Sequence, residues 1–354
     1  MTSASSRALG WSEPVSQSTG AVVETFALGS PPWPTLDPFL FCVHHVDDYP
    51  TGDERMAPTA SLDGRSIGQD FANVDGWNMY HGSVVPGFPA HPHRGFETVT
   101  YVRRGLIDHS DSLGATARFG SGDAQWLTAG AGIVHAEMFP LVDRAQGNPL
   151  EMFQIWLNLP AADKMVDPYF TMLWADDIPT VIRTDDEGRT ASVTVVAGSI
   201  DGARPPAPPP DSWAARSEAD IAILGLHVDA GATVDLPAAS VGTNRVLYLH
   251  GEGSAEIDGR LVTPPSGVVL QGAASVRIEA ASDVDALVLQ GRPIGDPVAQ
   301  YGPFVMNDRA GIEQAVADYQ RTGFGGWPWP ADDPVHPREQ GRFARHADGR
   351  VEHR

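Results

Sequence analysis

The chain has 354 residues, of which 42% are hydrophobic, and it contains 37 glycines and 30 prolines. This length is sufficient for two domains, and the composition is typical of a turn-rich globular β protein and excludes a largely disordered chain. The formal net charge of −21 disfavours direct binding to a nucleic-acid backbone, because contacts to phosphate groups need lysine and arginine.

Residues 1–35 are predicted to form an N-terminal leader that is polar, rich in serine and alanine, and contains one short strand in VVETFAL. The leader lacks the apolar run of a signal peptide, and no later stretch is apolar for long enough to span a bilayer. The single cysteine, Cys42, cannot form an internal disulfide and suits a reducing compartment. We therefore expect a cytoplasmic protein that does not contact a membrane.

Residues 36–200 contain a stretch that reads as strands joined by turns, with His91, His93, His135 and Glu137 at matching alternations. Side chains two apart on a strand point to the same face, so His91 and His93 project together, as do His135 and Glu137. If the two segments are neighbours in a small barrel, the four side chains meet inside it. Three imidazoles and one carboxylate suit Fe(II) above all, although other divalent transition metals also bind imidazole-rich sites.

A second carboxylate, Glu97, is a further candidate for this site. By alternation it lies on the face of His91 and His93, provided that no bulge intervenes, and Gly95 permits such a bulge. We expect Glu97 to be a pocket carboxylate close to the metal, where a buried and unpaired charge would need a proton or a hydrogen-bond donor.

Other histidines of this first half lack paired spacing. His44 and His45 are adjacent, so on a strand they point to opposite faces and cannot both join one site. His109 is interpreted as a solvated residue of a polar hairpin. Residues 51–80, rich in glycine, aspartate and serine, are predicted to form a loop or lid over one end of the barrel.

Residues 201–216 include the proline-dense stretch DGARPPAPPPDSW and are predicted to form a linker between domains. The strands expected just before it, in TVIRTD and ASVTVVAGSI, are predicted to close or extend the first barrel. Beyond the linker, residues 217–323 repeat a pattern of short strands with Gly or Asp turns, which is typical of a second all-β barrel. A helix with Asp308 as its N-cap is predicted at the end of this segment.

The second barrel is predicted to be free of metal, because His227 and His250 lie in separate strands without a His-x-His pair. Residues 324–354 are predicted to be a tail whose last residues are mobile. The histidines of this tail are interpreted as solvated, and they are His336, His346 and His353.

Four motifs resemble signatures of the pirin family of the cupin superfamily, in the order found in that family: HPHRGFETVTY, GDAQWLTAGAGIVHAEM, QIWLNLP with KMVDPY, and QYGPFVMN. The resemblance extends from Leu36 to Gly323. It implies an all-β bicupin, with two cupin barrels in one chain. It also implies that the N-terminal barrel holds iron through three histidines and one glutamate, and these ligands correspond to His91, His93, His135 and Glu137.

The family resemblance leaves two functions open. One is an iron-dependent dioxygenase of the quercetin 2,3-dioxygenase type, which would act on a small aromatic substrate and O₂ with Glu137 or Glu97 as base. The other is a redox-sensing regulator whose iron adjusts a surface that binds a transcription factor or a metabolic enzyme. An open, aromatic-lined pocket over the metal favours the enzyme, whereas a pocket plugged by residues 51–80, with an exposed apolar patch elsewhere, favours the regulator.

Overall fold

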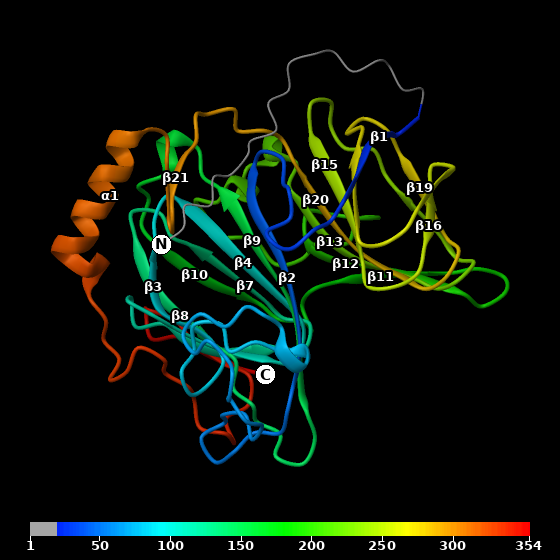
Figure 1. The fold of residues 1–354 in the computed structure, drawn as a ribbon. Coiled ribbons are helices and arrows are strands. Elements are labelled where there is room, and N and C mark those ends of the chain that lie inside the picture. The colour runs from blue at the N-terminus through cyan, green and yellow to red at the C-terminus, as the bar shows by residue number, and fades with distance from the viewer. Residues whose placement is uncertain (1–19) are drawn as a thin grey trace.

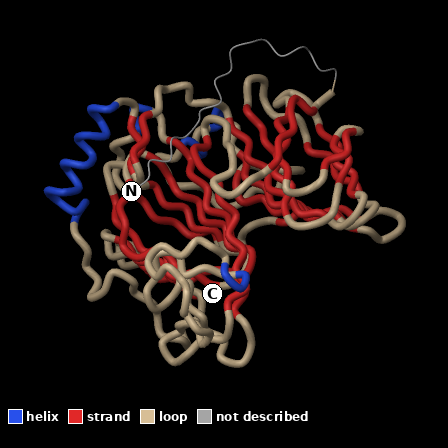
Figure 2. Tube along the Cα trace, in the orientation of Figure 1, coloured by secondary structure: helices blue, strands red, loops and turns tan. Residues whose placement is uncertain are grey.

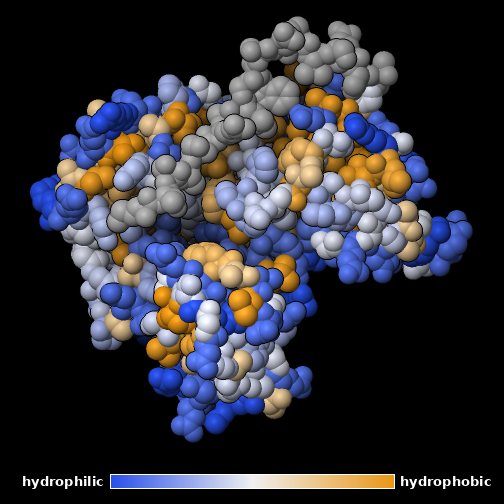
Figure 3. Space-filling model, in the orientation of Figure 1, coloured by the Kyte–Doolittle hydropathy of each residue, from blue (hydrophilic) through white to orange (hydrophobic). Residues whose placement is uncertain are grey.

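The computed structural model describes residues 20–354, in which antiparallel strands form two barrels that lie side by side (Figures 1 and 2). The predicted all-β bicupin architecture is confirmed. No helix within these residues is both long enough and apolar enough to cross a membrane. Hydrophilic residues cover much of the face shown in Figure 3, and hydrophobic residues on it form small separated groups.

The first barrel consists of two sheets that enclose an apolar interior. In order across the five-stranded sheet are β10 (Tyr169–Leu173), β7 (Ala124–Thr128), β4 (Phe96–Arg104), β9 (Asn148–Asn158) and β2 (Phe39–Tyr49). In order across the six-stranded sheet are β24 (Val351–His353), β23 (Phe343–Arg345), β6 (Thr116–Gly120), β5 (Leu106–Asp111), β8 (Ile133–Met138) and β3 (Gly87–His93).

The second barrel has a seven-stranded and a four-stranded sheet. The larger contains β1 (Val22–Ala27), β18 (Ser266–Leu270), β15 (Asn244–His250), β20 (Val284–Gly291), β13 (Ala222–Val228), β12 (Thr190–Ala197) and β11 (Thr180–Thr184). The smaller contains β14 (Thr233–Leu236), β19 (Val276–Ala280), β16 (Ala255–Ile257) and β17 (Arg260–Val262).

The sequence predicted that β11 and β12 close or extend the first barrel, and this prediction is wrong. Strand β12 pairs with β13 along most of its length, and its inward residues Val193 and Val195 belong to the core of the second barrel. The chain therefore passes into the second barrel before β11, and the proline-dense residues 201–216 connect two neighbouring strands of one sheet.

The two barrels share a continuous apolar layer. The five-stranded sheet contributes Phe153 and Ile155 of β9 to this layer, and the seven-stranded sheet contributes Leu287 and Leu289 of β20. All four side chains are nearly inaccessible to solvent. The outer face of the first barrel's sheet is thus an internal surface of the whole molecule.

After the second barrel the chain returns to the first, as expected for QYGPFVMN. The short strands β21 (Ala299–Tyr301) and β22 (Phe304–Met306) form a hairpin, and Phe304 bridges to Arg94. Helix α1 (Arg309–Thr322) then lies at the outer edge of the first barrel (Figure 1). Its predicted N-cap is confirmed, because the carboxylate of Asp308 accepts a hydrogen bond from the backbone N–H of Gly311 at 2.7 Å.

The C-terminal tail is ordered, which corrects the expectation of mobile last residues. Strand β23 pairs with β6 and with β24, so the tail extends the six-stranded sheet. The buried Arg118 forms a two-pronged ion pair with Asp108, with both N–O distances 2.7 Å, and also donates to tail carbonyls such as that of Pro337 at 2.8 Å. His346 is buried rather than solvated, and its Nε2 is 2.7 Å from Glu352 in β24.

Candidate metal centre and adjoining cavity

The two segments that carry the predicted ligands are neighbours. Strands β3 and β8 pair antiparallel, and the Cα of His91 is directly opposite that of His135. One ring nitrogen from each of His91, His93 and His135 lies within 4.8 Å of the others. The alternation of the sequence therefore brings three imidazoles to one point inside the first barrel.

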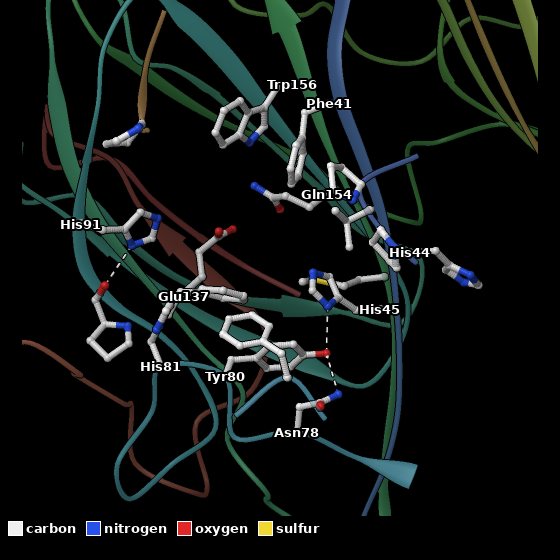
Figure 4. A pocket seen from close by; sticks show the side chains of 18 of the residues that line it. Phe41, His44, His45, Asn78, Tyr80, His81, His91, Glu137, Gln154 and Trp156 are labelled. Carbon is white, nitrogen blue, oxygen red and sulfur yellow. Dashed lines mark hydrogen bonds between the residues drawn. The ribbon is translucent and has the colours of Figure 1, made fainter. Parts of the chain in front are cut away.

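Glu137 lies beside this cluster, and its side chain points into the same cavity as His91 (Figure 4). Its Oε2 is 4.0 Å from Nε2 of His135, and its Oε1 is 2.9 Å from the hydroxyl of Thr100 on β4. Burial raises the pKa of Glu137, and the hydrogen bond from Thr100 opposes that rise. One carboxylate oxygen is thus held by the barrel wall while the other faces the imidazoles.

The three imidazoles have the protonation state that a metal requires. Burial lowers the pKa of His91 to about 4 and holds the pKa values of His93 and His135 well below the ordinary value, so all three are neutral near pH 7. Nδ1 of His91 is 2.8 Å from the carbonyl of Pro89; an N–H must donate there, which leaves Nε2 with its lone pair free. Within residues 20–354, neither buried ring nitrogen of His135 has a hydrogen-bond partner. This donor set fits a divalent transition metal.

Glu97 does not join the cluster, which corrects its expected position. Its Oε1 accepts hydrogen bonds from Trp126 at 3.2 Å and Thr128 at 2.7 Å, and its Oε2 accepts one from Ser212 at 2.6 Å. It is not part of the cavity wall. Burial raises the pKa of Glu97 to about 7, although the donors from Ser212, Thr128 and Trp126 lower it in part. Glu97 is therefore a satisfied structural carboxylate.

His109 is buried within β5 and is not a solvated turn residue. Its Nε2 lies 3.2 Å from Oδ2 of Asp111, and its ring stacks on Phe170 with a centroid distance of 5.0 Å. The ring centroid is 5.6 Å from that of His135. His109 thus packs behind the ligand cluster.

A cavity of about 980 Å³ adjoins the cluster, and His91, His93 and Glu137 form part of its wall. This volume is at the upper end of the range for small-molecule sites. Much of the remaining wall is aromatic, with contributions from Phe41, Phe71, Tyr80, Phe88 and Trp156. Residues 51–80 supply two of these rings to the wall and do not fill the cavity.

Several wall residues were not recognised as functional from the sequence. Met152, Gln154 and Trp156 alternate along β9 on the face that the sequence predicted, but they line the cavity rather than a closed core. His45 also lines the cavity, and its adjacency to His44 gave no spacing signal. The alternation of LEMFQIWLNLP, placed next to the ligand strands, could have indicated the first three.

Comparison with known proteins agrees with this architecture. Residues 31–157 match the family model described as Pirin, and residues 223–325 match the model of the pirin C-terminal cupin domain. A pirin-like protein of Caulobacter vibrioides is 40% identical over 244 residues, which cover 67% of this chain and 80% of that relative. The chain belongs to the pirin family. Human pirin, for example, is 32% identical over 271 residues, which cover 73% of this chain and 87% of the human protein.

A solved structure also resembles this pirin. The crystal structure of a quercetin 2,3-dioxygenase from Acinetobacter baumannii superimposes with a TM-score of 0.66 at 26% sequence identity. The alignment covers 87% of this chain and 96% of that protein. The similarity therefore extends over both barrels.

A second group of potential ligands lies at the junction of the two barrels of this pirin. One donor atom from each of His44, Glu151 and His250 lies within 4.8 Å of the others. The carboxylate of Glu151 is also ion-paired with Arg103, at 2.5 Å, and with Arg104, at 3.1 Å. Two guanidinium groups on the same carboxylate disfavour a cation there, so we interpret the group as a polar cluster at the junction. The ion pair that crosses the junction joins Arg103 of β4 to Asp285 of β20 at 2.6 Å.

Proposed function

We propose that this pirin is an iron-dependent dioxygenase that cleaves flavonol-type aromatic compounds, as a quercetin 2,3-dioxygenase does. One observation carries the proposal: an aromatic-lined cavity of about 980 Å³ whose wall includes His91, His93 and Glu137. A cavity of this size and lining suits a flat, largely apolar molecule. The likeness to the dioxygenase from Acinetobacter baumannii supports the same reaction class.

In this proposal His91, His93, His135 and Glu137 hold the iron. Bound there, iron would supply the Lewis acidity and redox chemistry needed for the reaction of a phenolic substrate with O₂. The regulatory alternative expected residues 51–80 to plug the pocket; these residues instead form part of its wall, which favours the enzyme.

The side chains around the cluster have separate roles in the proposal. The carbonyl of Pro89 fixes the ring of His91, and Thr100 fixes one oxygen of Glu137. We assign proton acceptance from the phenolic hydroxyl of the substrate to the carboxylate of Glu137. The ring of Trp156, which is stacked on Phe41 at a centroid distance of 4.6 Å, would hold the planar substrate and exclude water.

The test is a direct assay of oxygen consumption. Protein loaded anaerobically with Fe(II) is mixed with quercetin, and then with O₂; we expect O₂ uptake and release of carbon monoxide. His93→Ala should abolish this turnover. His227→Ala is the matched control, because it removes a partly exposed histidine of the second barrel and should leave turnover unchanged. Absence of turnover with quercetin and several other flavonols, in protein that holds stoichiometric iron, would refute the proposal.

A further inference from the structure

A chain of hydrogen bonds ends at the cavity wall on the side facing the ligand cluster. His45 of β2 lies across the cavity from His91 and Glu137 (Figure 4). Its Nδ1 is 2.8 Å from the hydroxyl oxygen of Tyr80, and that hydroxyl donates to Oδ2 of the buried Asp47 at 2.7 Å. Each member of this chain is therefore fixed by the one behind it.

The carboxylate of Asp47 sets the direction of the whole chain. Its Oδ1 accepts hydrogen bonds from the backbone N–H of Asn78 at 2.8 Å and from the side-chain amide of Asn78 at 3.0 Å. Burial raises the pKa of Asp47 to about 6, with hydrogen bonds from Tyr80 and Asn78 limiting the rise. Near pH 7 it is thus a buried anion that needs every donor within reach.

Counting protons then assigns the tautomer of His45. The hydroxyl of Tyr80 has one proton, and the charged carboxylate of Asp47 takes it, so the oxygen of Tyr80 must accept from Nδ1–H of His45. Nε2 of a neutral His45 consequently has an unprotonated lone pair. No hydrogen bond to this Nε2 is formed by any residue in 20–354.

The surroundings keep His45 neutral and fix its ring. Burial, followed by the neighbouring His44, lowers the pKa of His45 to about 3. The ring meets Tyr80 edge-on, with centroids 4.9 Å apart and an interplanar angle of 88°, and lies 6.0 Å from the ring of Phe88 at 64°. A hydroxyl on an aromatic ring that enters between these groups would find a fixed hydrogen-bond acceptor.

We propose that Nε2 of His45 accepts a hydrogen bond from a hydroxyl group at the end of the substrate remote from the metal centre. This inference rests on the proposed function and narrows its substrate class to aromatics with hydroxyl groups at both ends. Tyr80 and Asp47 act as positioning residues, because the hydroxyl of Tyr80 and the carboxylate of Asp47 act on the hydroxyl group of the substrate through the tautomer of His45, while the ring of Tyr80 forms part of the cavity wall. A buried acceptor left unpaired discriminates against a ligand that lacks the matching hydroxyl.

The test compares two flavonols, quercetin and galangin. Quercetin has hydroxyl groups on its pendant phenyl ring, the ring that we place remote from the metal centre, and galangin lacks them. Binding to metal-loaded protein is titrated without O₂ by following the absorbance of the flavonol. We expect His45→Leu to weaken the binding of quercetin by about tenfold, the usual loss for one buried hydrogen bond, and to change the binding of galangin by less than about twofold. His45→Gln, whose amide oxygen can accept in place of Nε2, should restore most of the preference for quercetin.

Tyr80→Phe provides a second route to the same conclusion if His45→Leu fails to fold. It removes the group that fixes the tautomer, so we expect a loss of about threefold for quercetin and none for galangin. Metal content should be the same in all variants, because neither residue belongs to the ligand cluster.

The outcomes separate this inference from the proposed function. Equal weakening of both flavonols, or no weakening of either, overturns the role of His45 and leaves the dioxygenase proposal in place. Equal affinity of the unmodified protein for quercetin and galangin also overturns it. Failure of both flavonols to bind the metal-loaded protein would overturn the two proposals together.

Discussion

The ion-paired carboxylate of Glu151, at the junction of the two barrels, should make the stability of this pirin sensitive to acid, and Glu151→Gln is the substitution that tests it. The carboxylate of Glu151 accepts from His44 at 3.2 Å and is ion-paired with Arg103 and Arg104. Glutamine keeps the shape and removes the charge. Arg103 retains a partner, because its other guanidinium nitrogen is 2.6 Å from Asp285, so the substitution does not leave a buried cation unpaired.

The magnitude follows from the proton affinity of Glu151. Burial alone would raise its pKa, but the hydrogen bond from His44 and the charge of Arg103 outweigh burial and lower the pKa from 4.5 to about 2. Each tenfold change in proton affinity corresponds to about 1.4 kcal/mol, which gives about 3 kcal/mol of stability. Arg104 is more than half exposed, so solvent screening reduces the expected contribution to about 2 kcal/mol.

The direction of the pKa shift of Glu151 determines the pH range in which this stability is lost. Because the pKa in the folded state is lower than in the unfolded state, the contribution is complete above about pH 5 and disappears as the pH falls from about 4.5 towards 2. Urea unfolding followed by tryptophan fluorescence should therefore show the variant about 2 kcal/mol less stable at pH 7. About half of that difference should remain at pH 3.

Glu256→Gln is the matched control, because Glu256 is exposed on the second barrel; it should be neutral at both pH values. A difference between the unmodified protein and Glu151→Gln that is absent at pH 7, or that stays constant down to pH 3, would refute the reasoning.

Three other substitutions test the remaining assignments. His93→Ala should reduce bound iron, measured by metal analysis, to less than about a tenth of stoichiometric while the far-UV circular dichroism is unchanged; a full complement of iron would contradict the ligand set. Glu97→Gln should lower the free energy of unfolding by about 1–2 kcal/mol, because it disturbs three buried hydrogen bonds. It should leave the iron content unchanged, and loss of iron would show that Glu97 takes part in the metal site. Arg118→Ala should cost about 3–5 kcal/mol by leaving the buried charge of Asp108 without its cation, and limited proteolysis should then cleave residues 324–354 first. An unchanged digestion pattern would show that Arg118 does not hold the tail.

The clustering of His91, His93, His135 and Glu137 was predictable because it depends on a local regularity. A strand places every second side chain on one face, so His91 with His93 and His135 with Glu137 each form a pair without knowledge of the rest of the fold. Only the pairing of β3 with β8 had to be assumed, and it is confirmed.

The same rule failed for Glu97 because the chain changes sheets between the two positions. Strand β3 ends at His93 and β4 begins at Phe96 in the other sheet. Gly95, at φ 85°, makes the turn, and a Cβ there would come within 2.0 Å of the carbonyl oxygen of Val305. The alternation of side chains along a strand does not continue across such a break. The sequence shows the glycine but not the partner that crowds it.

Burial of the remaining histidines depended on contacts distant in sequence. His109 lies in a segment that reads as a polar hairpin, and it is enclosed because β5 lies between β6 and β8 and because Phe170 covers its ring. His346 is enclosed because the tail pairs with β6. In both cases the local composition is polar, and the enclosing residues come from elsewhere in the chain.

Strand β9 has a consequence for any attempt to dissect this protein. Its even-numbered residues Met152, Gln154 and Trp156 form the cavity wall, while Phe153 and Ile155 between them pack against the second barrel. A fragment that ends after the first barrel would expose this apolar sheet face to water, which invites aggregation. The C-terminal barrel therefore supports the outer face of the sheet whose inner face forms the cavity wall, and substitutions at Leu287 or Leu289 should alter the shape of the cavity from the far side of that sheet.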